Sequence, residues 1–376
     1  MALVGRATAP GTQRYAERWQ ATEPNRAAVA GHPDLLGGLA ISPLGLGLAA
    51  GEPTVEVDAA YRAAIDSAVR SGCNHFDTAP SYRGQRSEAT LGRALAAMFA
   101  AGVAQRDEII VASKAGFIPY PANAPGDQRQ AIYDGFIAPG IAEPDDLAGG
   151  IHCLAPDFVS HQITWSLRTM GLRHIDIYYL QNPETQLSFV DRTTFRRRLQ
   201  LAFARLEEEV AGGRIGCYGV ATWEGLRLPP LSDHYMSLEV VMRLVTEVAG
   251  PRHHLRVVQM PLSLATLEAM TLRNQPIGKN LLAALPAAAD LGLAVVASAA
   301  LGQGQIPPRL EQALGEAYGG LDTFSQRALQ FARSLPGVAS ALFGSVDAKH
   351  VRENLAVLDA PPDPKAALRL VRMKGR

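Results

Sequence analysis

The chain alternates eight times between a short apolar run and a longer segment with helical periodicity. Apolar residues spaced i, i+3, i+4 indicate amphipathic helices, and short apolar runs between such helices are typical of buried parallel strands. We predict strands at residues 44–47, 74–76, 109–113, 175–180, 215–220, 256–260, 294–298 and 340–343. We predict helices at residues 57–69, 87–100, 157–170, 194–211, 237–248, 281–291, 323–334 and 347–358. Eight such units predict an α/β fold, a (β/α)8 TIM barrel with its active site at the C-terminal ends of the strands.

The length sets the domain organisation. A chain of 376 residues, of which 47% are hydrophobic, can bury one large core. We predict an N-terminal arm (residues 1–35), a single barrel domain (residues 36–360) and a C-terminal tail (residues 361–376). A β-hairpin is predicted at residues 38–42, just before the first strand.

Three connections are too long to be simple turns. They follow the third, fifth and seventh strands, at residues 115–156, 223–236 and 301–321. Loops that follow the strands shape the sites of barrels. The first connection contains apolar and aromatic residues, unlike a disordered tether, so we expect an ordered lid over the site.

A competing architecture comes from Gly45, Gly47 and Gly51, which follow a strand and imitate a dinucleotide-binding glycine fingerprint. In that fold the third glycine lies inside the opening helix, whereas Pro53 and Thr54 here place the helix start after the last glycine. No acidic residue follows at the expected distance on a second strand end. The barrel is therefore the favoured architecture.

The charge balance and the cysteine content limit the kinds of partner and the cellular location that we expect. The chain has 36 basic and 36 acidic residues, so it carries no footprint for nucleic acid. It has neither a signal-peptide pattern nor an apolar run of about 18 residues that could span a bilayer. Cys73, Cys153 and Cys217 are widely spaced, as in a reduced intracellular protein. We expect a soluble cytoplasmic protein with a small-molecule substrate, no membrane partner and no metal site; the oligomeric state cannot be inferred.

Three polar residues fall at the C-terminal ends of neighbouring predicted strands. Asp77 ends the second strand, Tyr82 follows in its loop, and Lys114 ends the third. A buried Asp77–Lys114 ion pair is expected there, because charges at this position need partners. A nearby ammonium lowers the pKa of a phenol, which would make Tyr82 a general acid.

The residues around this trio resemble the aldo-keto reductase family. Residues 74–92, which contain Asp77, Tyr82 and Gly84, are similar to the first signature of that family. Further similar segments are residues 176–184, 214–220 and 328–355, so the resemblance covers nearly the whole barrel. It implies an oxidoreductase that transfers hydride from NADPH, with NADH as a possible alternative, to the carbonyl group of an aldehyde or ketone.

The resemblance also implies roles for individual residues. Tyr82 would be the proton donor, Lys114 would lower its pKa, and Asp77 would orient both. The implied cofactor-binding residues are Thr222, Gln259, Ser298, Leu301, Gly302, Gly344, Ser345, Lys349, Arg352, Glu353 and Asn354.

Four departures from the family pattern mark a divergent, bacterial-type member. Gln181 stands where the family has a catalytic histidine; its amide can donate a hydrogen bond but cannot take a proton. Ser298 replaces the aromatic residue that stacks on the nicotinamide, and Trp223 is a candidate to compensate. Thr222 follows Ala221 in place of a serine–asparagine pair. The usual positions for reading the 2′-phosphate fall at Gly344 and His350, which leaves Lys349 and Arg352 as displaced candidates.

These departures leave three functions open. The first is carbonyl reduction with Tyr82 as the acid and Gln181 positioning the substrate. The second is a specialised enzyme that reduces a C=C bond or catalyses a cofactor-assisted dehydration, cyclisation or epimerisation. The third is a noncatalytic cofactor sensor, which would not need the three catalytic-type residues together.

His152 in the lid has two interpretations. It could lie over Tyr82 and replace the missing imidazole, or it could close its loop by a hydrogen bond to the backbone. We favour the second, and adjacent His152 and Cys153 do not make a tetrahedral metal site. Phe117, Tyr120 and Tyr133 would suit an apolar or ring-bearing substrate.

Overall fold

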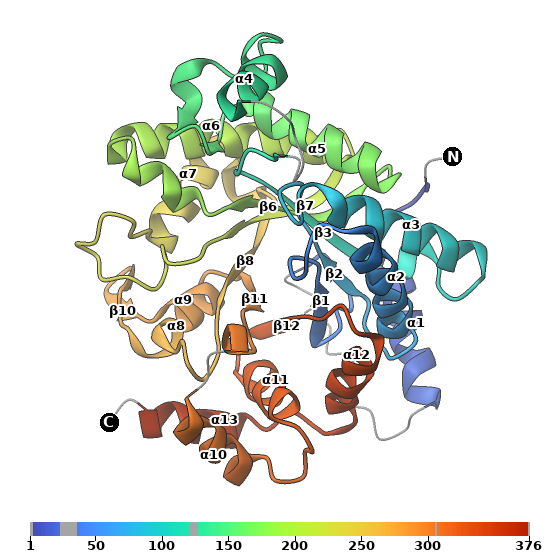
Figure 1. Cartoon of the computed structure of the whole chain (residues 1–376). Helices are drawn as coiled ribbons and strands as arrows, with labels where there is room; N and C mark the ends of the chain where they lie inside the picture. The colour runs from blue at the N-terminus through green and yellow to red at the C-terminus, as the bar shows by residue number, and fades with distance from the viewer. Residues whose placement is uncertain (1–2, 23–35, 121–126, 305–306, 375–376) are drawn as a thin grey trace.

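The computed structural model describes residues 3–22, 36–120, 127–304 and 307–374. Its centre is a closed barrel of eight parallel strands, drawn in Figure 1. The strands are β1 (Leu44–Gly47), β2 (His75–Asp77), β3 (Ile110–Ala115), β6 (Ile175–Gln181), β7 (Ile215–Ala221), β8 (Leu255–Pro261), β11 (Ala294–Ser298) and β12 (Val338–Gly344). β1 pairs with β2 on one side and with β12 on the other, which closes the barrel. The predicted (β/α)8 fold is confirmed, and each predicted strand overlaps an observed one.

A helix follows each barrel strand. These helices are α2 (Val55–Val69), α3 (Arg86–Ala100), α5 (Pro156–Met170), α6 (Arg192–Ala211), α7 (Leu238–Ala249), α9 (Ala284–Asp290), α11 (Phe324–Ser334) and α12 (Ala348–Leu355). Their apolar faces pack on the outside of the strands in one large core. Short 3-10 helices also occur, at η4 (Pro183–Ser188), η5 (Gly250–Arg252) and η7 (Ala356–Asp359). The final helix, α13 (Pro364–Lys374), buries Ala367 and Leu370 beside α11.

The predicted β-hairpin at residues 38–42 is wrong. Residues 36–43 form turns and irregular backbone, and the chain before them contains helix α1 (Ala9–Thr22). The amide of Ala40 donates to the Thr12 hydroxyl (3.0 Å), and that of Ser42 donates to Asn74 Oδ1 (2.8 Å). Side chains of α1 and of the segment before β2 thus satisfy backbone groups that a hairpin would have paired.

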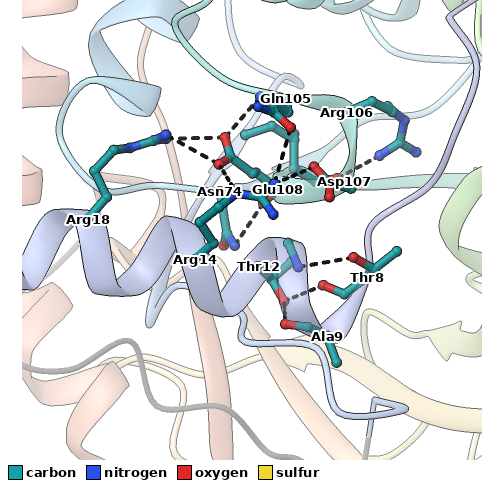
Figure 2. Close-up of polar contacts among 12 residues, drawn as sticks. Thr8, Ala9, Thr12, Arg14, Arg18, Asn74, Gln105, Arg106, Asp107 and Glu108 are labelled. Carbon is teal, nitrogen blue, oxygen red and sulfur yellow. Dashed lines mark hydrogen bonds and ion pairs between the residues drawn. The ribbon is translucent and has the colours of Figure 1, made fainter.

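Helix α1 is fixed to the barrel by ion pairs that Figure 2 shows. Arg14 and Arg18 both reach Glu108 at 3.2 Å, in the 3-10 helix η1 (Arg106–Glu108), and the side chain of Glu108 is fully buried. The Tyr15 hydroxyl donates to the Val69 carbonyl oxygen at 2.6 Å. The N-terminal segment is therefore part of the folded body around the barrel.

The three predicted long connections are confirmed, and a fourth was missed. The connection after β3 contains α4 (Gln128–Ile132), the π-helical turn η2 (Tyr133–Ile137), η3 (Pro144–Asp146), β4 (Leu147–Ala148) and β5 (His152–Cys153). The connection after β11 contains η6 (Gly302–Gly304) and α10 (Pro308–Ala317). The missed one follows β8 and contains α8 (Glu268–Thr271), β9 (Gln275–Ile277) and β10 (Asn280–Leu282). β10 also shows that the predicted helix at residues 281–291 begins too early.

The connection after β3 packs Ile118, Ile132, Phe136 and Cys153 with Phe158 of α5 in a small apolar core. Inside the barrel, inward-facing side chains form another apolar cluster that includes residues from most of the strands. In the described part of the chain, no helix is long and apolar enough to cross a membrane.

Candidate active site

Strand alternation places a set of polar side chains at the barrel mouth. Successive residues of a strand point to opposite faces, so a residue two positions beyond an interior residue also points inward. Ala112, Tyr179, Val257 and Val296 belong to the interior cluster. Two positions further along the same strands stand Lys114, Gln181, Gln259 and Ser298.

Asp77 is the centre of a buried polar network. Lys114 forms an ion pair with Asp77 Oδ1, and Lys114 Nζ also donates to the Thr78 carbonyl oxygen at 3.0 Å. Gln259 Nε2 donates to Asp77 Oδ2 at 2.8 Å. Lys114 and Asp77 are only 1% and 3% exposed. The predicted ion pair is confirmed, and Gln259 completes the partners of the carboxylate.

Lys114 remains protonated although it is buried. Burial is the largest single effect and lowers the pKa of Lys114, but the Asp77 carboxylate and the Tyr82 hydroxyl together raise it more, so the net pKa lies above its ordinary value. A lysine with a raised pKa is cationic at neutral pH. The site therefore holds a fixed positive charge beneath Tyr82.

Tyr82 is partly buried, and Lys114 Nζ lies 4.9 Å from the centroid of its ring. Burial raises the pKa of Tyr82, and this effect is larger than the opposing effect of the Lys114 charge. The net pKa of Tyr82 therefore lies above its ordinary value, and the predicted lowering is wrong. The phenol therefore keeps its proton at neutral pH. That is the protonation state a proton donor needs.

The turn that carries Tyr82 is held by Asp58, which the sequence analysis missed. Arg83 has a φ of 49°, a left-handed conformation that is uncommon outside glycine. Its guanidinium donates to Asp58 Oδ1 at 2.8 Å, and Arg86 Nε donates to Asp58 Oδ2 at 3.0 Å. Asp58 is 2% exposed. The signal for it was an acidic residue on the same helix face as buried Tyr61 and Ile65.

Gln181 ends β6, and its backbone is held by a residue of the connection after β3. His152 Nε2 lies 2.7 Å from the Gln181 carbonyl oxygen, so it carries the proton and donates it. The side-chain amide of Gln186 donates to His152 Nδ1 at 2.9 Å, and Arg198 binds the amide oxygen of Gln186. Burial lowers the pKa of His152 to about 4. The loop-closing interpretation of His152 is confirmed: it is a neutral imidazole engaged with the Gln181 backbone.

Glu184 organises the loop after β7 and was also missed. Its Oε1 accepts hydrogen bonds from the Thr222 hydroxyl (2.6 Å) and the backbone amides of Trp223 (2.8 Å) and Glu224 (3.1 Å). The Thr222 hydroxyl, expected to contact a cofactor, is therefore already engaged. Glu184 closes the fourth-strand segment quoted from the sequence, but its partners come from another strand, and nothing local predicted them.

A cavity of about 390 Å³ opens over these groups. Of the predicted site residues, it is lined by Asp77, Tyr82, Gln259, Ser298, Leu301 and Gly344. Trp223, which is 42% exposed, lines this cavity together with Ser298. The predicted residues that do not line it are Lys114, Gln181, Thr222, Gly302, Ser345, Lys349, Arg352, Glu353 and Asn354.

Most of the remaining predicted cofactor residues lie on or just before helix α12, directly after Gly344. Asp347 caps this helix by accepting a hydrogen bond from the Lys349 amide at 2.6 Å. Lys349 is exposed and lies 3.7 Å from Glu353, whereas Asn354 is buried. Lys349 is thus an exposed cation on α12 that does not line the cavity, and Asn354 is buried in the protein.

Comparison with known proteins agrees with this architecture. The model of the Aldo/keto reductase family matches residues 43–241. No curated protein sequence matches the chain significantly.

Solved structures extend the likeness over the whole fold. An aldo/keto reductase from Klebsiella pneumoniae in complex with NADP and acetate is 21% identical, with a TM-score of 0.60 over 90% of this chain and 93% of that one. A thermostable aldo-keto reductase in complex with the inhibitor epalrestat is 17% identical, with a TM-score of 0.61 over 89% and 95%. The aldose reductase from Schistosoma japonicum is 17% identical, with a TM-score of 0.60 over 92% of both chains. At these identities the structural likeness establishes the fold.

Proposed function

The chain belongs to the aldo/keto reductase family, and from that membership we propose that it is an NADPH-dependent oxidoreductase that reduces the carbonyl group of an aldehyde or ketone. The observation that carries the proposal is the buried network of Asp77, Lys114 and Gln259 beneath the phenol of Tyr82. A noncatalytic sensor would have no use for a protonated phenol held above a fixed cation.

The cavity suits a flat nicotinamide ring. Gly47, Ala49, Ala50 and Gly344 line part of it, and these two glycines and two alanines leave room beside the strand ends. Trp223 supplies an aromatic surface in the same cavity, which supports its role in place of the aromatic residue missing at Ser298. Lys349 and Arg352, on the helix after Gly344, are the candidates for the 2′-phosphate that distinguishes NADPH from NADH.

In the proposed reaction, NADPH would supply, when bound, the hydride for the carbonyl carbon. Tyr82 gives its proton to the carbonyl oxygen, and the charge of Lys114 stabilises the phenolate that remains. Asp77 and Gln259 keep Lys114 in place. Gln181 donates an amide hydrogen bond to the substrate oxygen without exchanging a proton.

The specialised alternative is supported by Gln181 itself. His152 does not supply the missing imidazole, since it is neutral and donates to the Gln181 carbonyl oxygen. A site with a single proton-exchanging group could also serve an activated C=C bond, where the proton goes to carbon.

Cinnamaldehyde separates the two functions because it carries both bonds. We expect NADPH to bind, seen as enhanced nicotinamide fluorescence, and cinnamyl alcohol to form as the product. If the saturated aldehyde is the sole product, the enzyme reduces the C=C bond, and the proposal of carbonyl reduction is wrong. If neither NADPH nor NADH binds, both functions fail.

A further inference from the structure

A second cavity lies outside the active site, between helix α5 and the long connection after β3. Its volume is about 330 Å³, within the range of small-molecule sites. The residues that matter here are Tyr120, Ile132, Phe136, His161, Gln162 and Trp165. None of them lines the cavity over Tyr82.

Aromatic rings form much of its wall. The ring of Phe136 meets that of His161 edge to face, with centroids 5.8 Å apart, and the ring of His161 lies 6.5 Å from that of Trp165. Trp165 is 41% exposed, so part of its ring is open to solvent at the cavity. Such walls favour a planar apolar guest, which can make offset or edge contacts with several rings.

Two buried polar atoms along the same wall lack partners. Gln162 is 1% exposed, and its Oε1 makes no hydrogen bond within the part of the chain that the structure describes. His161 Nδ1 is likewise buried without a partner among those residues. Buried amide and imidazole groups are normally hydrogen-bonded, so this wall has unused capacity for a donor.

We propose that this cavity is a second small-molecule site, for an aromatic compound that carries a hydroxyl group. The ring would pack among Phe136, His161 and Trp165, and the hydroxyl would donate to Gln162. A purely apolar guest would leave the amide oxygen unsatisfied. The inference is independent of the reaction at Tyr82, since it concerns binding alone.

The probe is 4-methylphenol, and 4-fluorotoluene is its partner of similar shape without a hydrogen-bond donor. Binding to the full-length protein is followed by ligand-observed NMR titration. We expect 4-methylphenol to bind more tightly than 4-fluorotoluene. Gln162→Leu should weaken the binding of 4-methylphenol about fivefold to tenfold, which is the effect of one buried hydrogen bond. The affinity for 4-fluorotoluene should not change.

Two further variants separate this cavity from the active site. Ala131 lines the second cavity at an exposed position, so Ala131→Trp should block it without disturbing the core. Trp223→Ala alters only the active-site cavity. Loss of binding in Ala131→Trp with retention in Trp223→Ala supports the proposal. Absence of binding to the wild type, the reverse pattern in these variants, or equal affinity of the wild type for both probes overturns it.

Discussion

Asp77 uses both of its carboxylate oxygens, one for Lys114 and one for Gln259. A buried ion pair of this kind is sensitive to the loss of one partner, because the other charge is then left in a medium of low polarity. At the scale of single residues, the stability of the protein thus depends on the active-site ion pair.

Replacing Lys114 by methionine should destabilise the protein, because Asp77 would keep a buried charge with only the Gln259 amide as partner. We expect the free energy of unfolding to fall by about 3 kcal/mol, measured by urea denaturation. The control is Lys349→Met on the exposed face of α12, where the change should stay within about 0.5 kcal/mol. Equal stability of the two variants would contradict the role of the buried pair.

His152 predicts a dependence of stability on pH. Its pKa is lowered to about 4 by burial, whereas in the unfolded chain it is about 6.5. The unfolded state therefore binds more protons between these values, so stability is full above pH 6.5 and falls as the pH drops toward 4. His75, whose pKa is also lowered to about 4, acts in the same direction.

The measurement is the free energy of unfolding at pH 6 and pH 5 in the wild type and in His152→Gln, whose amide can still donate to Gln181. Each buried histidine should contribute a loss of about 1 kcal/mol over this interval. Between pH 6 and pH 5, the free energy of unfolding of the variant should therefore fall by about 1 kcal/mol less than that of the wild type. An unchanged difference between the two pH values would show that His152 is not the neutral, buried group described.

At the scale of elements, the strands carry most of the polar site residues, and the connections after them complete the cavity. The carboxylate of Glu184 accepts hydrogen bonds from the hydroxyl of Thr222 and from successive backbone amides of the loop after β7. Trp223, on that loop, lines the active-site cavity. The loop is therefore shaped by a charge from the neighbouring strand connection.

Glu184→Gln should loosen this loop, because a neutral amide oxygen accepts these hydrogen bonds less strongly than a carboxylate. We expect KM for an aldehyde to rise about fivefold to tenfold, with kcat changed much less. Steady-state kinetics with saturating NADPH measures both. Glu224→Gln, on the same loop but more exposed, is the matched control, and equal KM values in the two variants would contradict the account.

Periodicity predicted the barrel strands well, because each is a buried run with a helix behind it. The hairpin at residues 38–42 failed for a different reason: Thr12 and Asn74, both distant in sequence, satisfy its backbone. The insertion after β8 was missed since its strands, β9 and β10, have only three residues each. Among site residues, Asp77, Tyr82 and Lys114 were predictable from strand ends, whereas Asp58 and Glu184 act through partners on other elements.

At the scale of the whole molecule, the barrel is supported from outside by helix α1. Arg14 and Arg18 pair with Glu108, whose side chain is fully buried, and Tyr15 is buried beneath the helix (Figure 2 shows the two arginines). This contact joins the start of the chain to the turn before β3, the strand that ends in Lys114.

The double variant Arg14→Ala/Arg18→Ala should therefore destabilise the whole protein, since it removes the two arginines that pair with Glu108 in the described part of the chain. We expect a loss of about 3 kcal/mol in the free energy of unfolding. Arg93→Ala serves as the control, because Arg93 is 60% exposed and lies 3.9 Å from its acidic partner. A double variant as stable as this control would mean that α1 contributes little to the fold.

The central claim is that Tyr82 donates the proton in a reduction driven by NADPH. The most direct test compares single turnovers of wild type and Tyr82→Phe with bound NADPH and a simple aldehyde, after fluorescence titration has shown equal cofactor affinity. Loss of a general acid should slow the reaction by roughly a hundredfold to ten-thousandfold. A Tyr82→Phe variant that reduces the aldehyde as fast as the wild type would contradict the claim.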